Sequence, residues 1–367
     1  MTNMRTPIAL YPYCSDLLAF VKHFEELQDR YCIKEIVSPK GLGICGKDAA
    51  YACNHPEIGI TVADELDFCS PAWEILLVSI SSTMNIDMNN LEDIIKRTLQ
   101  AGKSVQLYCD VSLLSIDIEK LSHKYPICSN TYTNDTYSLF SIENNHFAPI
   151  DLPVILVGGL LKQADVFEVL LCIANRLRTK GVHPLVIAQN KICDMFGFFG
   201  ISHIFTDMNL SEEQKILEAN LFIRKLIHRE MPGAILIEAP DAAIRFSNLD
   251  PNGFGVLTYM LCQAIVPDFF VCCIPYQLAV CELVDALSAD FSLRIGTPIH
   301  AVHASNLIVD SSSLLETRKI SCVHTSLNNV NDHLKKEAQF ANIPFFNVLE
   351  EDAIGLYDEI NRVLSLW

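Results

Sequence analysis

The chain has 367 residues, of which 50% are apolar and 19% are charged, and its formal net charge at pH 7 is −17. This composition excludes intrinsic disorder, and the length predicts two domains that each bury a core. The acidic charge disfavours nucleic-acid binding, because the basic runs at 176–180 and 335–336 fit helix ends or solvated helix faces better than a phosphate-binding patch.

The first half alternates apolar strands with helices. Strands are predicted at 8–11, 32–37, 58–62, 75–80 and 104–109, and helices at 15–27 and 91–99. Continuous apolar strands, without polar alternation, are typical of a parallel sheet that is covered on both faces. Residues 126–151 then break this rhythm with a polar, turn-rich stretch that ends in two prolines. We therefore expect the domains to be 1–150 and 151–367.

The second half resumes the alternation. Strands are predicted at 154–157, 184–188, 234–238 and 269–274, with weaker strands at 292–296 and 301–307, and helices at 164–178, 211–228 and 357–366. Ser211 and Gln214 form a capping-box pattern at the start of the second of these helices. The predicted fold class is α/β, with two Rossmann-like three-layer domains and mostly parallel sheets, the second resembling a degenerate P-loop domain.

The cysteines and the hydropathy pattern predict the cellular compartment and whether the chain enters a membrane. The chain has 14 cysteines, many of them inside apolar strands, such as Cys272 and Cys273. The first residues carry no secretory signal and no apolar run reaches the length of a membrane span, so a cytoplasmic protein with reduced, buried cysteines is expected and a membrane partner is not.

A glycine-rich loop follows the second strand. It reads G-x-G-x-x-G and continues with a lysine, so backbone amides there could approach a diphosphate. A dinucleotide fingerprint belongs in the first strand–helix turn, which has no glycine here, so a purely structural loop is the alternative. The candidate ligand residues are Gly41, Gly43, Gly46, Lys47 and Asp48.

A second glycine turn is predicted after the strand 154–157, where a P-loop would stand. A P-loop needs Gly-x4-Gly-Lys-Ser/Thr, but counting from Gly158 the last three positions hold Gln163, Ala164 and Asp165. The motif is therefore degenerate and disfavours an NTPase. Gly158, Gly159 and Lys162 are its candidate ligand contacts.

Two carboxylates stand at the end of the strand 234–238, in the manner of a Walker-B strand. Glu238 and Asp241 are expected at the carboxyl edge of a parallel sheet, where open α/β proteins bind ligands. The alternative is that these carboxylates cap the next element. No metal site is predicted, since His300 and His303 lie in a segment that looks extended and would face opposite ways. No catalytic residue and no cofactor is assigned.

Several stretches resemble the peptide-maturation-system proteins. They are 8–13, 36–49, 158–159, 196–198, 252–255, 266–269, 343–347 and 357–360, which together span nearly the whole chain. Proteins of this family accompany radical-SAM-type enzymes and small precursor peptides in gene clusters for ribosomally made, modified peptides. The resemblance implies a role in natural-product peptide maturation and supplies no active residues.

Two hypotheses for function remain. In the first, the chain is a non-catalytic accessory protein that binds a precursor peptide or a peptide-modifying enzyme. In the second, it is a nucleotide- or dinucleotide-dependent enzyme with its site between the two α/β domains. The resemblance and the absence of a complete catalytic set favour the first, and whether the chain is an enzyme stays open.

Overall fold

The chain divides into two compact units. The computed structural model describes residues 5–80, 86–108, 114, 127–129, 146–351 and 353–365. Unit 1 comprises Met1–Thr133 and Asn190–Gly197, and unit 2 comprises Asn134–Gln189 and Phe198–Trp367. Most of the predicted irregular segment 126–151 lies outside the described residues.

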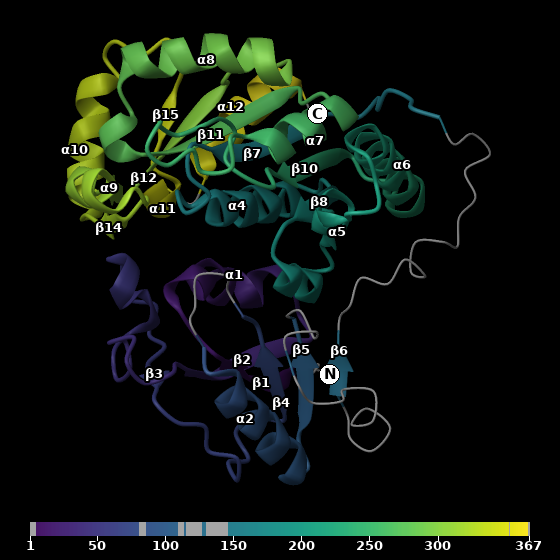
Figure 1. Cartoon of the computed structure of the whole chain (residues 1–367), viewed down its shortest axis with the longest axis vertical. Helices are drawn as coiled ribbons and strands as arrows, with labels where there is room; N and C mark the ends of the chain where they lie inside the picture. Colours follow the sequence, from purple (N-terminus) through teal and green to yellow (C-terminus); the bar gives the residue numbers. More distant parts are fainter. Residues whose placement is uncertain are drawn as a thin grey trace. The chain divides into compact units, whose positions relative to one another are not determined.

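Unit 1 is built on a six-stranded parallel sheet (Figure 1). The strand order is β3-β2-β1-β4-β5-β6. Its strands are β1 (Thr6–Tyr11), β2 (Tyr31–Val37), β3 (Val62–Ala63), β4 (Ile75–Val78), β5 (Ser104–Leu107) and β6 (Ile127–Ser129). Its helical elements are η1 (Ser15–Leu17), α1 (Leu18–Leu27), η2 (Ala49–Cys53), α2 (Met88–Gln100) and η5 (Lys191–Phe196).

The core of unit 1 has two parts. On one face of the sheet, Leu91, Ile95 and Leu99 of α2 pack with Trp73 and alternate residues of the central strands. Helix α1 lies on the other face. Its rings Phe20 and Phe24 contact Phe196 of η5 at centroid distances of 5.2 Å and 6.1 Å. The excursion 190–197 thus completes the aromatic core of unit 1.

Unit 2 is built on a seven-stranded parallel sheet with the order β15-β12-β11-β7-β10-β8-β9. Its strands are β7 (Val154–Gly159), β8 (Pro184–Ala188), β9 (Phe199–Gly200), β10 (Ala234–Glu238), β11 (Phe269–Pro275), β12 (Ala301–Ser305) and β15 (Phe345–Phe346). A separate antiparallel pair, β13 (Leu307–Val309) and β14 (Cys322–His324), follows β12.

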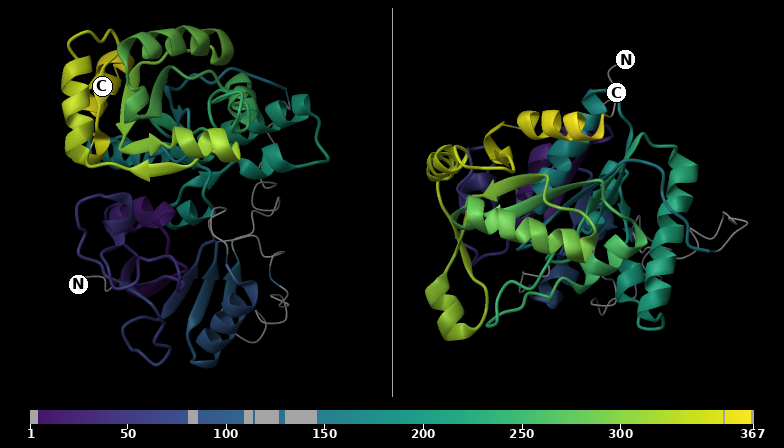
Figure 2. Two further views of the ribbon diagram at one scale, coloured as in Figure 1. Left: turned by 60° about the vertical axis from the view of Figure 1, so that its left-hand side comes forward. Right: turned by 90° about the horizontal axis from the view of Figure 1, so that it is seen from above.

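Helices cover both faces of this sheet (Figures 1 and 2). Helices α4 (Val166–Thr179), α11 (Val348–Glu351) and α12 (Ile354–Leu364) pack together on one face. On the other face, α6 (Glu212–Glu230), α7 (Val256–Ala264) and α8 (Cys281–Ile295) share one apolar cluster with alternate residues of the strands. The remaining helical elements are α5 (Ser202–Thr206), η6 (Tyr276–Leu278), α9 (Ser311–Thr317) and α10 (Leu327–Glu337).

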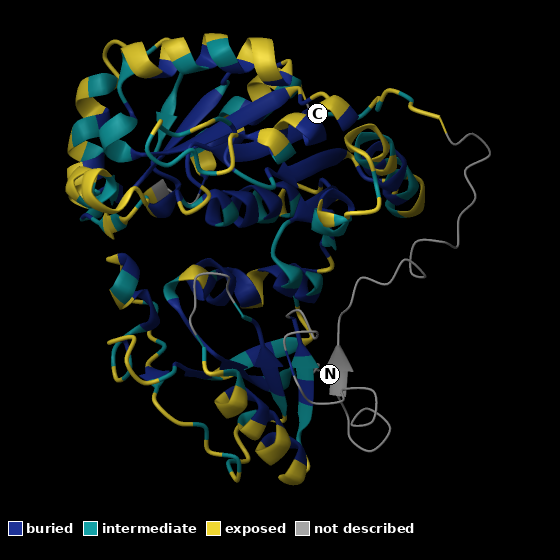
Figure 3. Cartoon of the chain, in the orientation of Figure 1, coloured by how far each residue is buried: buried dark blue, intermediate teal, exposed yellow. Residues whose placement is uncertain are grey.

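The central strands are buried on both sides, as their sequences predict (Figure 3). Every residue of β7, β10 and β11 is buried. The α/β class with mostly parallel sheets is confirmed, as is the burial of Cys272 and Cys273. The capping box is also confirmed, because Ser211 and Gln214 each accept a hydrogen bond from the other's backbone amide. Among the residues described, no helix has the length and apolarity to cross a membrane.

Three local predictions are wrong. The strand predicted at 58–62 is mostly irregular, and only Val62 of it lies in β3. Residues 292–295, predicted as a weak strand, are the last turn of α8, and Gly296 ends that helix in a left-handed conformation. Gly158 and Gly159, predicted to turn the chain, are instead the last two residues of β7. A Cβ on Gly159 would lie 1.8 Å from the carbonyl oxygen of Cys273, so this glycine lets β7 and β11 approach each other.

Replacing Gly159 with alanine should therefore destabilise unit 2. We expect a loss of about 3 kcal/mol or more, because backbone atoms cannot move aside as a side chain can. The matched control is Gly233→Ala, whose Cβ would meet only the Val182 side chain at 3.3 Å. Urea unfolding of both variants measures the difference, and equal losses would contradict this explanation of the glycine.

Candidate ligand-binding site

The carboxyl ends of β7, β10, β11 and β12 meet at one edge of the parallel sheet in unit 2. The segment 160–165 leads from β7 to α4, and residues 239–255 lead from β10 to α7. In open parallel sheets, ligands bind at this edge, above neighbouring strands whose connections run to opposite faces. Here α4, which follows β7, lies on one face, and α7, which follows β10, lies on the other. The carboxyl ends of β7 and β10 are therefore a position where a ligand is expected to bind.

Glu238 is the buried carboxylate of this edge. It is 2% exposed, and its Oε2 accepts a hydrogen bond of 2.8 Å from the backbone amide of Gln189. Burial raises the pKa of Glu238, while the nearby Lys162 ammonium and the Gln189 amide lower it. Two residues that the sequence singled out, Glu238 and Lys162, thus interact electrostatically in the structure.

Asp241 has a structural role. Its Oδ1 accepts hydrogen bonds from the amide and hydroxyl of Thr258, at 2.8 Å and 2.6 Å, and its Oδ2 accepts one from the amide of Leu257 at 3.2 Å. These amides belong to the first turn of α7, which has no cap from its own N-cap residue, Gly255. Asp241 therefore matches the capping alternative.

A pocket of about 500 Å³ opens beside the segment 160–165. Two hydrogen bonds hold its walls together, one of 2.9 Å from the Ile320 amide to Asp250 Oδ2 and one of 3.3 Å from Asn252 Nδ2 to the carbonyl of Leu160. The lining residues are Gln163, Leu249, Asp250, Pro251, Asn252, Arg318, Lys319 and Ile320.

The pocket carries two exposed cations, Arg318 and Lys319. Neither side chain has an ion pair or a hydrogen bond with any residue that the structure describes. The Asp250 carboxylate in the same pocket accepts hydrogen bonds from the Ile320 and Asn252 amides. The pocket therefore offers positive charge to a ligand. The sequence analysis did not identify Arg318 and Lys319. They belong to no motif, and they are far along the chain from β7 and β10, whose following segments line the same pocket.

The glycine loop 41–46 lies in unit 1, in the connection that follows β2. All three of its glycines have positive φ, and Lys47 Nζ lies 3.6 Å from the centroid of the Tyr51 ring. The carboxylate of Asp48 accepts hydrogen bonds from the amides of Ala50, Ile58 and Gly59. In this arrangement Lys47 and Asp48 organise the long connection between β2 and β3.

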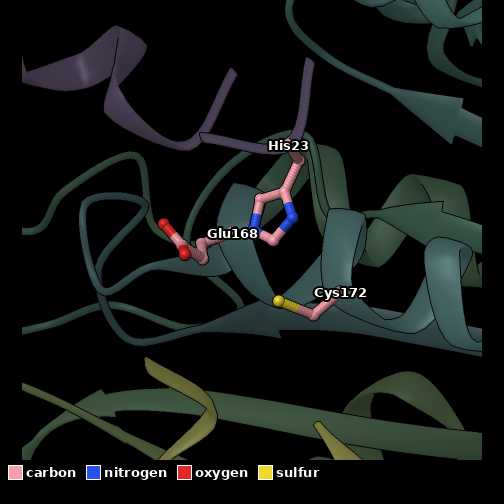
Figure 4. Close-up of side chains that lie close together, drawn as sticks. All are labelled: His23, Glu168 and Cys172. Atoms are coloured by element: carbon pink, nitrogen blue, oxygen red, sulfur yellow. The ribbon is translucent and has the colours of Figure 1, made fainter. Parts of the chain in front are cut away.

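Two side chains of unit 2 that could serve as metal ligands lie on one helix. Glu168 and Cys172 lie four residues apart on α4, as Figure 4 shows, and both are buried. Of the two histidines, His303 lies in β12 and His300 precedes that strand.

The comparisons with known proteins bear on the fold. No family model matches the chain, and neither does any curated protein. A solved structure of a DUF1611 family protein from Anabaena variabilis is similar, with a TM-score of 0.61, 11% identity, and coverage of 98% of this chain and 100% of that one. A nucleotide-binding protein in complex with ADP from Archaeoglobus fulgidus gives a TM-score of 0.31 at 10% identity, covering 58% of this chain and 87% of that one. At such identities the first likeness shows a shared fold alone.

The hydrogen bonds of Asp48 predict a pH-dependent stability. Burial raises the pKa of the Asp48 carboxyl, but the hydrogen bonds from backbone amides together lower this pKa by a larger amount. The pKa in the folded protein therefore lies below the ordinary value for aspartate. The stabilisation is present above the unfolded pKa of about 3.9 and is lost as the pH falls through the folded pKa. Asp48→Asn should cost about 1–3 kcal/mol at pH 7 and progressively less below pH ~4. Unfolding curves across pH 2.5–7 check this, and a constant difference between variant and wild type would refute it.

Proposed function

We propose that unit 2 binds a small phosphate-bearing molecule in the pocket lined by Arg318 and Lys319. The observation that carries the proposal is a pair of cations, without partners among the described residues, in a pocket at the carboxyl edge of a parallel sheet. Buried or recessed phosphates are commonly held by arginine and lysine, with arginine donating two parallel hydrogen bonds.

The size of the pocket also suits a small molecule. The pocket volume of about 500 Å³ is in the range for small metabolites and cofactors. Nucleotides are small phosphate-bearing molecules, so a nucleotide-dependent enzyme is one function that fits this proposal.

Binding of phosphate compounds tests the proposal directly. Inorganic phosphate, pyrophosphate, AMP and ATP are each added to the full chain, and the melting temperature is followed. A ligand at about 100 times its dissociation constant adds roughly 2.7 kcal/mol of stability, which is a shift of several degrees. We expect such a shift for at least one compound and its loss in the double variant Arg318→Ala/Lys319→Ala.

The matched control removes an adjacent cationic pair from the same unit. Lys335 and Lys336 are exposed on α10, outside the pocket. The variant Lys335→Ala/Lys336→Ala should keep the shift in full. A shift that survives the loss of Arg318 and Lys319, or no shift with any compound, would reject the pocket as a phosphate site.

An accessory role in peptide maturation is a second candidate, and an apolar strip on unit 2 favours it. Four large apolar side chains lie along α7 and its flanks, and each is about half exposed. They are Phe254, Val256, Tyr259 and Val266. Val256 and Tyr259 lie three residues apart and therefore on one face of the helix. Exposed apolar groups of this kind are typical of surfaces that bind a peptide or protein.

Fluorescence anisotropy with a labelled precursor peptide of a ribosomally made, modified natural product tests this second role. The double variant Tyr259→Ser/Val266→Ser should weaken binding by about tenfold or more, since burying an apolar side chain contributes about 1.5–3 kcal/mol. The control Leu293→Ser removes an exposed leucine of α8 outside the strip. Equal affinities for wild type and both variants would count against the strip as a peptide surface.

A further inference from the structure

The pocket of unit 2 is lined by three charged residues, and their charges do not cancel. Arg318 and Lys319 carry one positive charge each, and Asp250 carries one negative charge. Neither cation forms an ion pair with Asp250 or with any other carboxylate that the structure describes. The pocket therefore has a net charge of one positive unit, and both cations are available to a ligand.

Backbone amides fix Asp250 in the wall of the pocket. Its Oδ1 accepts a hydrogen bond of 3.0 Å from the Asn252 amide, and its Oδ2 accepts one of 2.9 Å from the Ile320 amide. The Ser247 hydroxyl holds the backbone of Asp250, since it donates to the carbonyl at 3.1 Å and accepts from the amide at 3.0 Å. The carboxylate cannot swing away without losing these bonds. Its negative charge therefore keeps its place beside the segment that carries the cations.

Hydrogen bonds also hold the backbone of the two cationic residues. The amide of Arg318 donates to the Leu314 carbonyl at 3.1 Å, and the amide of Lys319 donates to the Thr317 hydroxyl at 3.3 Å. Arg318 and Lys319 are adjacent, so their Cα atoms are about 3.8 Å apart. Two charges that start from neighbouring points suit one phosphate group better than a chain of phosphates, which needs cations along its length.

A single phosphate group balances the positive charge of the pocket. A phosphate monoester carries about −1.5 to −2 at pH 7, which already exceeds the one positive unit that the lining residues supply. A second phosphate or carboxylate on the ligand would meet the fixed charge of Asp250, with no further cation among the lining residues. Like charges brought together lower the affinity, and this penalty lets a site reject a related ligand.

The rest of the wall suits the uncharged body of an organic molecule. It consists of three apolar side chains and two amides, from Leu249, Pro251, Ile320, Gln163 and Asn252. The Gln163 side chain is exposed and has no hydrogen-bond partner among the described residues. A side-chain amide both donates and accepts, so Gln163 can bind a hydroxyl group of a ligand.

We propose that this pocket selects a phosphate monoester with an uncharged body over ligands that carry a second anionic group. The inference rests on the proposed phosphate site and names the class of its ligand. Arg318 and Lys319 bind the phosphate, and Asp250 excludes further negative charge. Sugar phosphates and nucleoside monophosphates belong to the selected class, whereas nucleoside di- and triphosphates are rejected.

Isothermal titration calorimetry on the full chain tests this with ligands that differ in charge. AMP, ADP and ATP are compared without magnesium and at low ionic strength, where charges are least screened. Glucose 6-phosphate and 6-phosphogluconate form a second set, because they are similar in size and differ by a carboxylate. Inorganic phosphate is the reference for the anion alone. In each set that binds, we expect the monoester without a second anionic group to bind about fivefold or more tightly than its more highly charged partners.

Variants at Gln163 change the charge of the pocket without removing a hydrogen bond from its wall. Gln163→Lys adds a cation and should reduce the preference for AMP over ADP to about twofold or less, while Gln163→Glu should increase it. The control Gln263→Lys adds the same charge at an exposed position of α7 outside the pocket and should leave the preference unchanged. Asp250→Asn should also reduce the preference, but it places an amide nitrogen against a backbone amide, so the Gln163 variants are decisive.

Each contrary result has a distinct meaning. If ADP, ATP or 6-phosphogluconate binds as tightly as the monoester of its set, the selection is overturned and the phosphate site stays intact. A preference that Gln163→Lys does not reduce, or that Gln263→Lys reduces to the same extent, overturns the selection as well. Binding of inorganic phosphate alone overturns the uncharged body. If no compound binds, the phosphate site itself fails and the inference fails with it.

Discussion

The close approach of β7 and β11 underlies the arrangement of unit 2. Gly159 lies against the carbonyl of Cys273, and the amide of Leu160 donates to that same carbonyl at 3.2 Å. The two central strands therefore stay paired to their last residues, and the segment 160–165 leaves the sheet at one defined point. Gln163 and the start of α4 take their places from that point, so a contact between backbone atoms positions one wall of the pocket.

The site is assembled from parts of different kinds. The sheet supplies Glu238, which is buried and accepts a hydrogen bond from the Gln189 amide. The segment between α9 and β14 supplies Arg318 and Lys319, which are exposed. The sheet thus holds a buried carboxylate in place, while a connection outside the main sheet supplies the cations.

Sequence reasoning predicted the sheet better than the site. Continuous apolar runs marked β7, β10 and β11, because a strand buried on both faces has no polar positions. The glycine pair was misread as a turn, because glycine is needed both for left-handed turns and for close backbone contact, and the sequence does not separate these uses. Asp241 and Glu238 are three residues apart, yet one caps α7 and the other is buried against Gln189. Their roles depend on tertiary partners that no local pattern contains.

The excursion 190–197 has a consequence for the order in which the chain folds during synthesis. Phe196 packs with Phe20 and Phe24 of α1, but it is translated only after β7, α4 and β8 of unit 2. Domains usually fold in the order in which they leave the ribosome. Here the N-terminal unit lacks part of its aromatic core until the ribosome has made the first strands of the next unit. The nascent chain therefore carries two unfinished units at once, and the completion of the first is tied to the growth of the second.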